Sequence, residues 1–348
     1  MSGGTYQVLF IRFSSLGDVL LTTPAVRGLK ESLPGSRITF LTKRAFAPLL
    51  EGNPSIDRVV LLEDADDGGR LPGLIRLCRG LGTFDAVVDL HGNLRSRVAC
   101  ASVLAERVLR YSKGAVRRRL WILGLMRPDI SGTERHVIQR YLEALGPLGV
   151  DREPGRPEIH LRPEEESEVR SLLREHGLED RSRYAVLIPG ARWPNKRWTV
   201  EGFAAVARWL NREMGTVAVL AGDGGEREWS KAVAASAGEG TVQLTGETNL
   251  RQLAALLKGA RVALGNDSGP AHMAAAVGTP LVSLFGPTSE AFGFRPYGDR
   301  VRVVSHDISC RPCTLHGGDS CPRGKRACLD GIGADEVIEA MLDVMSTA

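Results

Sequence analysis

The sequence predicts an α/β protein of two domains, each built on a parallel sheet. Short apolar runs alternate with helical patterns in both halves of the chain, and the connections between them are short. This alternation is typical of parallel sheets that carry helices on both faces. A charged, proline-rich stretch at residues 151–163 interrupts the pattern and predicts a linker. We therefore expect an N-terminal domain over residues 1–155 and a C-terminal domain over residues 156–348, with the last helix able to pack back on the N-terminal domain.

The expected strands are short and buried, and most end at a glycine or a polar loop. In the first half they cover residues 8–13, 37–42, 58–62 and 84–90, with helices over 18–33 and 71–81. A helix over 163–176 leads to the second half, where strands are expected at 184–188, 217–221, 242–244, 262–264 and 281–285. Loops that follow such strands meet at one edge of the sheet, where open α/β sheets bind ligands.

Composition excludes several classes of protein. The chain has 348 residues with 45 basic and 41 acidic side chains, an excess too small to indicate a nucleic-acid binder. No apolar run reaches the length of a membrane span, and the first one carries Arg12, which does not fit a secretion signal. The first strand is followed by Ser14–Asp18 rather than by a glycine fingerprint, which disfavours an NAD-dependent oxidoreductase.

Asp18 has two interpretations. It lies in the first turn of the expected helix, where a carboxylate stabilises the helix start, and the local sequence favours this structural role. The alternative is a general base that accepts a proton from an attacking hydroxyl.

Two loops of the second half are suited to phosphate groups. Residues 189–198, PGARWPNKRW, place three cations after a strand, and Lys196 is a candidate for contacting a diphosphate or simply a solvated lysine. Residues 265–272, GNDSGPAH, put Pro270 at a helix start, where unpaired backbone N–H groups bind anions. Asp267 is better placed there to accept a sugar hydroxyl or to orient the loop than to meet a phosphate.

Three further features carry alternatives. Glu226, after the glycine turn AGDGGE, is either an acceptor for nucleoside hydroxyls or an ordinary first-turn acid. The basic run 107–119 is either a solvated face or a contact for an anionic substrate. Four cysteines near the C-terminus resemble a zinc knuckle with irregular spacing, so a structural role in a long loop is preferred over a metal site: Cys310, Cys313, Cys321 and Cys328.

Taken together, these segments resemble glycosyltransferase family 9, the ADP-heptose:lipopolysaccharide heptosyltransferases. The resemblance runs along nearly the whole chain. It is carried by VLFIRFSSLGDVLLTTPAVRGLK, DLHGNLRS, PGARWPNKRW, AGDGGE, LTGETNL and GNDSGPAHMAAAVGTPLVSLFGPT. The cysteine-bearing tail is similar to that of the branch containing heptosyltransferase II.

The resemblance implies a GT-B fold, in which two Rossmann-like doubly wound parallel-sheet domains face a central cleft. It also implies an inverting enzyme, without a metal or other cofactor for its chemistry, that moves heptose from ADP-heptose to the lipid A-Kdo/heptose inner core. Such a protein is expected in the cytoplasm, able to contact the inner membrane. The matching positions assign catalysis to Asp18 and donor binding to Lys196, Glu226, Thr248, Asp267, Ser268, Gly269 and His272. For acceptor binding we expect Ser15, Gly17, Arg95, Arg117 and Arg118, the arginines being candidates to hold the anionic inner core.

Two other functions fit the same sequence. One is a GT-B transferase or sugar epimerase with another nucleotide-sugar donor, such as UDP-N-acetylglucosamine. The other is a non-catalytic protein that binds nucleotides or glycans, in which Asp18 would be dispensable.

Overall fold

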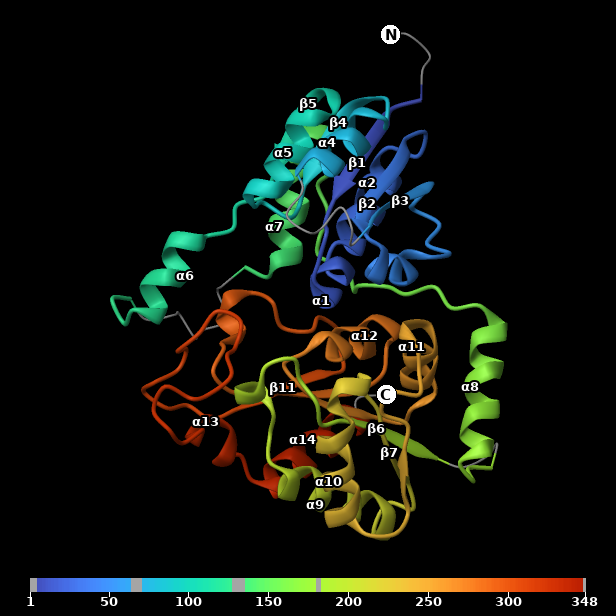
Figure 1. The fold of residues 1–348 in the computed structure, drawn as a ribbon, viewed down its shortest axis with the longest axis vertical. Helices are drawn as coiled ribbons and strands as arrows, with labels where there is room; N and C mark the ends of the chain where they lie inside the picture. Colours follow the sequence, from blue (N-terminus) through green and yellow to red (C-terminus); the bar gives the residue numbers. More distant parts are fainter. Residues whose placement is uncertain (1–4, 64–70, 127–134, 180–182, 347–348) are drawn as a thin grey trace. The chain divides into compact units, whose positions relative to one another are not determined.

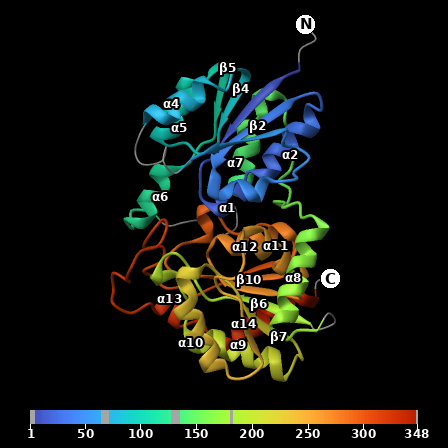
Figure 2. The same cartoon turned by 45° about the vertical axis from the view of Figure 1, so that its right-hand side comes forward.

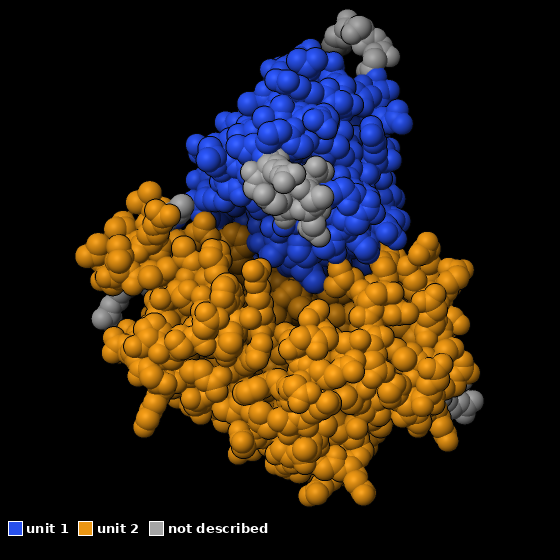
Figure 3. Space-filling model, viewed as in Figure 1, with its two compact units in different colours: residues 1–114, 135–160 blue, residues 115–134, 161–348 orange. Residues whose placement is uncertain are grey.

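The chain folds into two α/β units, each built on its own parallel sheet. A computed structural model describes residues 5–63, 71–126, 135–179 and 183–346. By their contacts, the described parts of residues 1–114 and 135–160 form the first unit, and those of residues 115–134 and 161–348 form the second (Figure 3).

The first unit has a sheet of five strands in the order β3-β2-β1-β4-β5, all parallel (Figure 1). Helices α4 and α5 cover one face, and α2 packs with α7, which Figure 2 shows on the other face. Gly28 of α2 permits the close contact between α2 and α7, since a Cβ at this position would lie 3.1 Å from Leu142. The elements are β1 (Gln7–Ile11), α1 (Leu16–Leu20), α2 (Thr23–Ser32), β2 (Arg37–Lys43), η1 (Arg44–Leu50), β3 (Arg58–Leu62), α4 (Leu71–Arg79), β4 (Thr83–Asp89), α5 (Leu94–Ser102), β5 (Leu104–Arg110), α7 (Val137–Ala144) and η2 (Gly146–Leu148).

The second unit has a sheet of six strands in the order β11-β10-β9-β6-β7-β8, again all parallel. Helices α9, α10 and α14 pack on one face, and α11 and α12 on the other (Figure 2). The elements are α6 (Ala115–Ile122), α8 (Pro163–Glu175), β6 (Tyr184–Ile188), η3 (Pro194–Lys196), α9 (Val200–Arg212), β7 (Val217–Leu220), η4 (Gly224–Glu226), α10 (Arg227–Ala237), β8 (Thr241–Gln243), α11 (Leu250–Gly259), β9 (Ala263–Asn266), α12 (Gly269–Val277), β10 (Leu281–Phe285), η5 (Glu290–Phe292), β11 (Val301–Ser305), α13 (Ala327–Asp330) and α14 (Ala334–Ser346).

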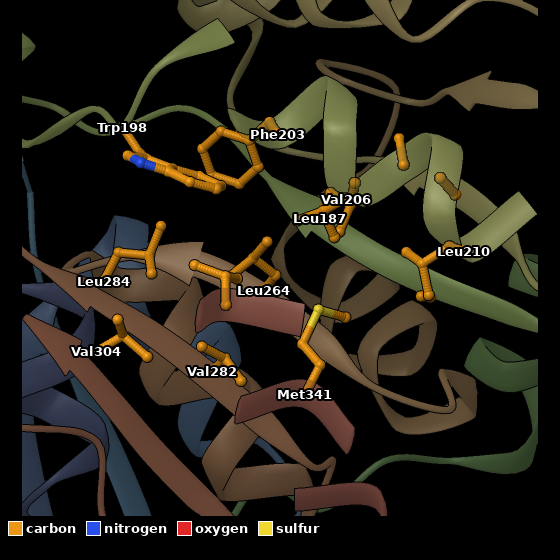
Figure 4. Close-up of a cluster of buried hydrophobic side chains, with 14 of the residues drawn as sticks. Leu187, Trp198, Phe203, Val206, Leu210, Leu264, Val282, Leu284, Val304 and Met341 are labelled. Carbon is orange, nitrogen blue, oxygen red and sulfur yellow. The ribbon is translucent and has the colours of Figure 1, made fainter. Parts of the chain in front are cut away.

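A large apolar core joins the second sheet to its helices. Trp198 and Phe203 meet edge to face, with ring centroids 5.2 Å apart, above the strand residues of β9, β10 and β11 (Figure 4). Met341 of α14 completes this layer. Because burying side chains of this size stabilises by roughly 1.5–3 kcal/mol each, the cluster makes the second sheet a rigid support for the loops at its edge.

The parallel two-sheet fold predicted from the sequence is confirmed, with local differences. The helix expected over residues 18–33 is two helices, because Pro24 in the first turn of α2 starts a new one. Residues 115–126 group with the second unit rather than the first, since Trp121 of α6 stacks on Phe292 at 5.8 Å. Helix α14 packs against α9, β10 and β11 of the second unit, where Val337, Met341 and Val344 are buried, whereas the sequence allowed it to pack on the N-terminal domain. No helix in the described part of the chain is long and apolar enough to cross a membrane.

Candidate functional site

Asp18 lies just beyond the carboxyl end of β1, in the first turn of α1. One of its oxygens, Oδ2, accepts three hydrogen bonds: from the Ser15 N–H (3.1 Å), from the Ser15 hydroxyl (2.7 Å) and from the Arg12 guanidinium (2.8 Å). Burial acts to raise the pKa of Asp18, but the Arg12 charge and the Ser15 bonds outweigh it and lower the pKa to about 2. Asp18 is therefore both a structural carboxylate of the helix start and ionised at neutral pH, with a quarter of its side chain exposed.

Arg12 is the buried centre that holds this carboxylate. Its side chain is only 7% exposed, and it donates to the carbonyl oxygens of Ser14 (2.8 Å) and Leu90 (2.5 Å) as well as to Asp18. A fourth bond goes to the Tyr141 hydroxyl at 3.2 Å. Burial acts to lower the pKa of the Arg12 guanidinium, but Asp18 and the neighbouring tyrosines raise it above its usual value. The guanidinium thus joins the ends of β1 and β4 to α7.

The loop after β4 contributes a second group of polar side chains beside β1. Asp89, fully buried, accepts from the N–H groups of His91 (3.0 Å) and Gly92 (2.7 Å) and from the Ser96 hydroxyl (2.9 Å). This turn places the His91 ring 5.0 Å and the Arg95 guanidinium 5.7 Å from the ring centre of Phe13. Burial, with the nearby charges of Arg12 and Lys113, lowers the pKa of His91 to about 3, so its imidazole is neutral.

Of the sequence-predicted residues of the first unit, Ser15 and Asp18 are in direct contact. Gly17 is buried in α1 between them. Arg95 lies at the neighbouring strand end, and β1 and β4 pair directly in the sheet. The acceptor residues proposed for this unit therefore gather at one edge of the first sheet.

In the second unit, Lys196 and Asp267 form an ion pair beyond the carboxyl ends of the strands of its sheet. Lys196 Nζ lies 2.5 Å from Asp267 Oδ2, and both side chains are largely buried, at 12% and 14% exposed. The hydroxyl of Thr288 donates to the same oxygen at 2.7 Å. Lys196 follows β6, Asp267 follows β9 and Thr288 follows β10. Asp267 thus orients the lysine, a contact that the sequence analysis did not predict.

Asn266 fixes the distance between those two loops. It is completely buried, its amide donates to the carbonyl oxygens of Pro189 (2.9 Å) and Gly190 (3.0 Å), and its Oδ1 accepts from the N–H of Trp198 (2.9 Å). One side chain at the end of β9 therefore sets the path of the whole loop that carries Lys196.

The amino end of α12 is adjacent to this ion pair. Ser268 is the N-cap, in an extended conformation, and makes no side-chain capping bond. Its buried hydroxyl has no hydrogen-bond partner among the residues that the structure describes. Gly269 is the first helical residue and Pro270 the second, one position later than the sequence suggested, and His272 is buried one turn further on. Together the Ser268 hydroxyl and the first-turn N–H groups offer several donors to one anion.

Glu226 is packed against two glycines at the ends of β6 and β7. A Cβ at Gly190 would lie 2.1 Å from the Glu226 carboxyl carbon, and one at Gly222 would lie 2.6 Å from Oε2. Oε2 accepts from the Asp223 N–H at 3.1 Å. Burial raises the pKa of Glu226 above its usual value. Glycine is thus required at both positions because the carboxylate occupies the space of their side chains.

Thr248 lies in the loop after β8, where its buried hydroxyl has no hydrogen-bond partner. The sequence-predicted donor residues therefore follow four strands that are neighbours in the sheet, in the order β9-β6-β7-β8. Parallel strands end at the same edge, so these residues share one rim.

The basic run 107–119 is divided between two elements, which belong to different units. Its first part is the edge strand β5, and its second part begins α6. Arg117 lies over the ring of Trp121 at 5.2 Å, and Arg118 over the ring of Phe294 at 5.3 Å. Arg95 belongs to the first unit, whereas Arg117 and Arg118 belong to the second.

The four C-terminal cysteines are free thiols that lie in and beside a long loop without regular structure. Among the residues that the structure describes, no group of three or more His, Cys, Asp or Glu side chains is arranged to hold a metal ion. Burial raises the pKa of Cys328 to about 11, which makes it a poor nucleophile. The loop instead contacts the segment that carries Lys196, through Asn195 and Gly318.

Sequence reasoning missed the residues that hold the candidates in place: Arg12, His91, Tyr141, Asn266 and Thr288. Arg12 and Asn266 are polar residues at the ends of apolar strands, and that position is a usable signal. The other three offer none, because their partners are set by the fold.

A family model described as glycosyltransferase family 9 (heptosyltransferase) matches residues 74–319. Lipopolysaccharide heptosyltransferase 3 of Escherichia coli K12 is 27% identical over 293 residues, which cover 82% of this chain and 83% of that protein.

Solved structures agree in fold along the whole chain. A family 9 glycosyl transferase from Veillonella parvula DSM 2008 superposes with a TM-score of 0.83 at 25% identity, covering 100% of this chain and 99% of the other. The ADP-heptose lipopolysaccharide heptosyltransferase II of E. coli superposes with a TM-score of 0.75 at 21% identity, covering 98% and 99%. The fold is therefore of the GT-B kind, two parallel-sheet α/β domains.

Proposed function

The chain belongs to glycosyltransferase family 9, the heptosyltransferases, and from that premise we propose that it transfers L-glycero-D-manno-heptose from ADP-heptose to the lipopolysaccharide inner core with inversion at C1. The observation that carries this proposal is the chemistry of the two rims. The first unit presents an ionised carboxylate, Asp18, and the second presents a lysine beside a helix start with an unpartnered serine hydroxyl.

The rim of the second unit is suited to a nucleoside diphosphate. In the proposal, Lys196 and the N–H groups of Ser268 and Gly269 bind the diphosphate, since a cation and a helix start both attract phosphate. Glu226 and the Thr248 hydroxyl contact the nucleoside, and His272 supports the loop from inside α12. Asp267 keeps Lys196 oriented before the donor arrives and prevents an unpaired buried ammonium.

The same groups promote departure of ADP. As the bond between C1 and the phosphate oxygen breaks, negative charge grows on that oxygen, and the preorganised donors stabilise it. The proposal assigns no metal ion or cofactor to this step, because Lys196 and the amides of α12 supply the positive charge.

Asp18 is proposed as the base that receives the acceptor's proton. With a pKa near 2 it is a weak base, so proton transfer occurs late, once the hydroxyl oxygen has begun to bond to C1 and has become acidic. The oxygen attacks from the face opposite to ADP, one bond forms as one breaks, the proton moves to Asp18, and the configuration inverts. Ser15 and Gly17 shape this site, and Arg95 with Arg117 and Arg118 bind the carboxylates and phosphates of the inner core.

The test is incubation of the protein with ADP-heptose and a lipid A-Kdo acceptor, with the product identified by mass and linkage. We expect heptose addition with the anomeric configuration inverted, and Asp18→Asn should lower turnover about 100-fold or more without loss of ADP binding. Transfer from UDP-N-acetylglucosamine instead would replace the donor in this proposal. Unchanged turnover in Asp18→Asn would remove Asp18 as the base.

We also propose that the enzyme works in the cytoplasm at the inner membrane, and that α6 is its membrane contact. Trp121 anchors the inner side of this helix on Phe292. Val116 and Arg119 of α6 are exposed, and so are Leu123 and Leu125 in the turn that directly follows it; the three aliphatic side chains are 73%, 68% and 69% exposed. Exposed aliphatic side chains beside a cation fit an anionic lipid surface, where the acceptor's own lipid resides.

Vesicle sedimentation tests the membrane contact. The double variant Leu123→Ser/Leu125→Ser should lose binding to vesicles that contain phosphatidylglycerol, while its ADP affinity stays unchanged. Leu342→Ser, which alters an exposed leucine of α14, is the matched control and should bind as the parent does. Equal binding by all three proteins would exclude α6 as the contact.

A further inference from the structure

The long loop between β11 and α13, residues 306–326, contacts both sides of the Lys196–Asp267 pair. It carries Cys310, Cys313 and Cys321 and is called the cysteine loop below. The reaction proposed above assigns no role to this loop. Its hydrogen bonds, however, are concentrated on the two short segments that hold the ion pair.

The first part of the loop fixes the segment that holds Asp267. Arg311 donates to the Thr288 carbonyl oxygen through Nε (3.3 Å) and Nη2 (3.1 Å), and the Cys313 N–H donates to the Pro287 carbonyl oxygen (3.0 Å). The Thr288 hydroxyl in turn donates to Asp267 at 2.7 Å. Arg311 is thus connected to Asp267 by hydrogen bonds through a single residue, Thr288.

The second part of the loop fixes the segment that holds Lys196. Asn195 is only 4% exposed, and its backbone N–H donates to the Gly318 carbonyl oxygen at 3.2 Å. Its side chain accepts from the Gly318 N–H at 2.9 Å and donates to the Ser320 carbonyl oxygen at 3.3 Å. Gly317 lies against Trp193 so closely that a Cβ there would be 2.7 Å from the indole. Lys196 directly follows this doubly fixed asparagine.

We propose that the cysteine loop is the positioning element of the donor diphosphate site, and that Asn195 and Arg311 act through Lys196 and Asp267. A lysine on a flexible stem loses side-chain entropy when it binds a phosphate. The cysteine loop already holds the backbone beside Lys196 and its carboxylate partner, so part of this entropy cost is removed before the donor binds. The donor therefore binds more tightly. The identity of the ligand rests on the proposed function, but the positioning does not.

The experiment is a titration of ADP into Asn195→Ala and Arg311→Met by calorimetry, followed by steady-state kinetics. Each variant removes two or more hydrogen bonds, and each should weaken ADP binding about 10-fold. The donor KM should rise to match, and the acceptor KM should stay unchanged. Asn195→Asp keeps the oxygen that accepts from Gly318 and should recover part of the affinity.

A double-mutant cycle separates positioning from general damage. In a Lys196→Met background, Asn195→Ala should cost no further affinity, because the group through which it acts is gone. Asn211→Ala is the matched control: this asparagine also joins two segments, accepting from the Ala218 N–H at 3.1 Å, but on α9 and β7. It should leave ADP affinity unchanged.

Two results would overturn the proposal. One is an equal loss of affinity from Asn195→Ala with and without Lys196. The other is an equal rise in the donor and acceptor KM values. If Asn195→Ala fails to fold, Arg311→Met decides, since it tests the other end of the loop. If the parent protein binds UDP and not ADP, the proposed donor is wrong, and the same cycle is run with UDP.

Discussion

The ion pair between Arg12 and Asp18 gives the sharpest quantitative prediction. Both side chains are less than a third exposed, at 7% and 24%, and their atoms are 2.8 Å apart. The pKa of Asp18 falls from 3.8 to about 2, which corresponds to roughly 2 kcal/mol at about 1.4 kcal/mol per pKa unit. Arg12→Met keeps most of the aliphatic stem but removes the charge and also the bonds to Ser14, Leu90 and Tyr141. The part of its effect that depends on pH therefore reports the Asp18 contribution.

The pH dependence follows from the direction of the shift. Because the folded pKa of Asp18 is below its unfolded value, the pair stabilises the protein fully above about pH 4, and this contribution is lost as the pH falls toward 2. In Arg12→Met, only the Ser15 bonds still oppose burial, so the pKa of Asp18 rises and the low-pH loss becomes smaller. The free-energy difference between parent and variant should therefore be about 3 kcal/mol at pH 7 and clearly smaller at pH 3.

Urea unfolding at pH 7 and pH 3 measures this difference, and the kinetic counterpart is the acid limb of the turnover profile. That limb should move to higher pH in Arg12→Met as Asp18 becomes easier to protonate. Arg44→Met is the control, because the Arg44–Glu63 pair is exposed and should show no measurable change in stability. An equal stability difference at both pH values would refute the argument that Arg12 acts through the Asp18 charge.

Three further predictions concern the rim of the second unit. Asn266→Ala removes three buried hydrogen bonds and should lower the free energy of unfolding by about 3 kcal/mol in urea; a loss below 1 kcal/mol would contradict its bridging role. Gly190→Ala should destabilise the protein and weaken ADP binding, because the added methyl would overlap the Glu226 carboxylate, and Gly35→Ala, where nothing lies within 4 Å, is the control. Since burial raises the pKa of Glu226, ADP affinity should begin to fall on acidification above the ordinary glutamate range. Glu226→Gln should abolish that dependence, and a persisting pH dependence would assign it to another group.

The fold was predictable from the sequence wherever local pattern and burial agree. Central strands such as β1 and β6 are continuous apolar runs, since both faces of the sheet are covered. The edge strands β5 and β11 were not predicted. The residues of β5 are largely exposed and most of those of β11 are half-buried, so charged positions such as Arg107 and Arg302 remove the apolar signal. Pairing with β4 and β10, a long-range contact, is what makes them strands.

The residues of the candidate site also differ in whether local sequence could indicate them. Asp18, Lys196 and Asp267 could be found because each follows a predicted strand, and parallel strands bring their ends to one edge. Their partners could not, because Arg12 meets Tyr141 across 129 positions of sequence and Asn266 meets Pro189 across 77. Local sequence therefore indicates which groups can act on a substrate, while the contacts that set their charge and distance come from tertiary packing. It follows that the structural role of Asp18 and its proposed role as the base are compatible. The bonds that hold Asp18 at the start of α1 also keep it ionised, so a substitution that removes them should change stability and turnover together.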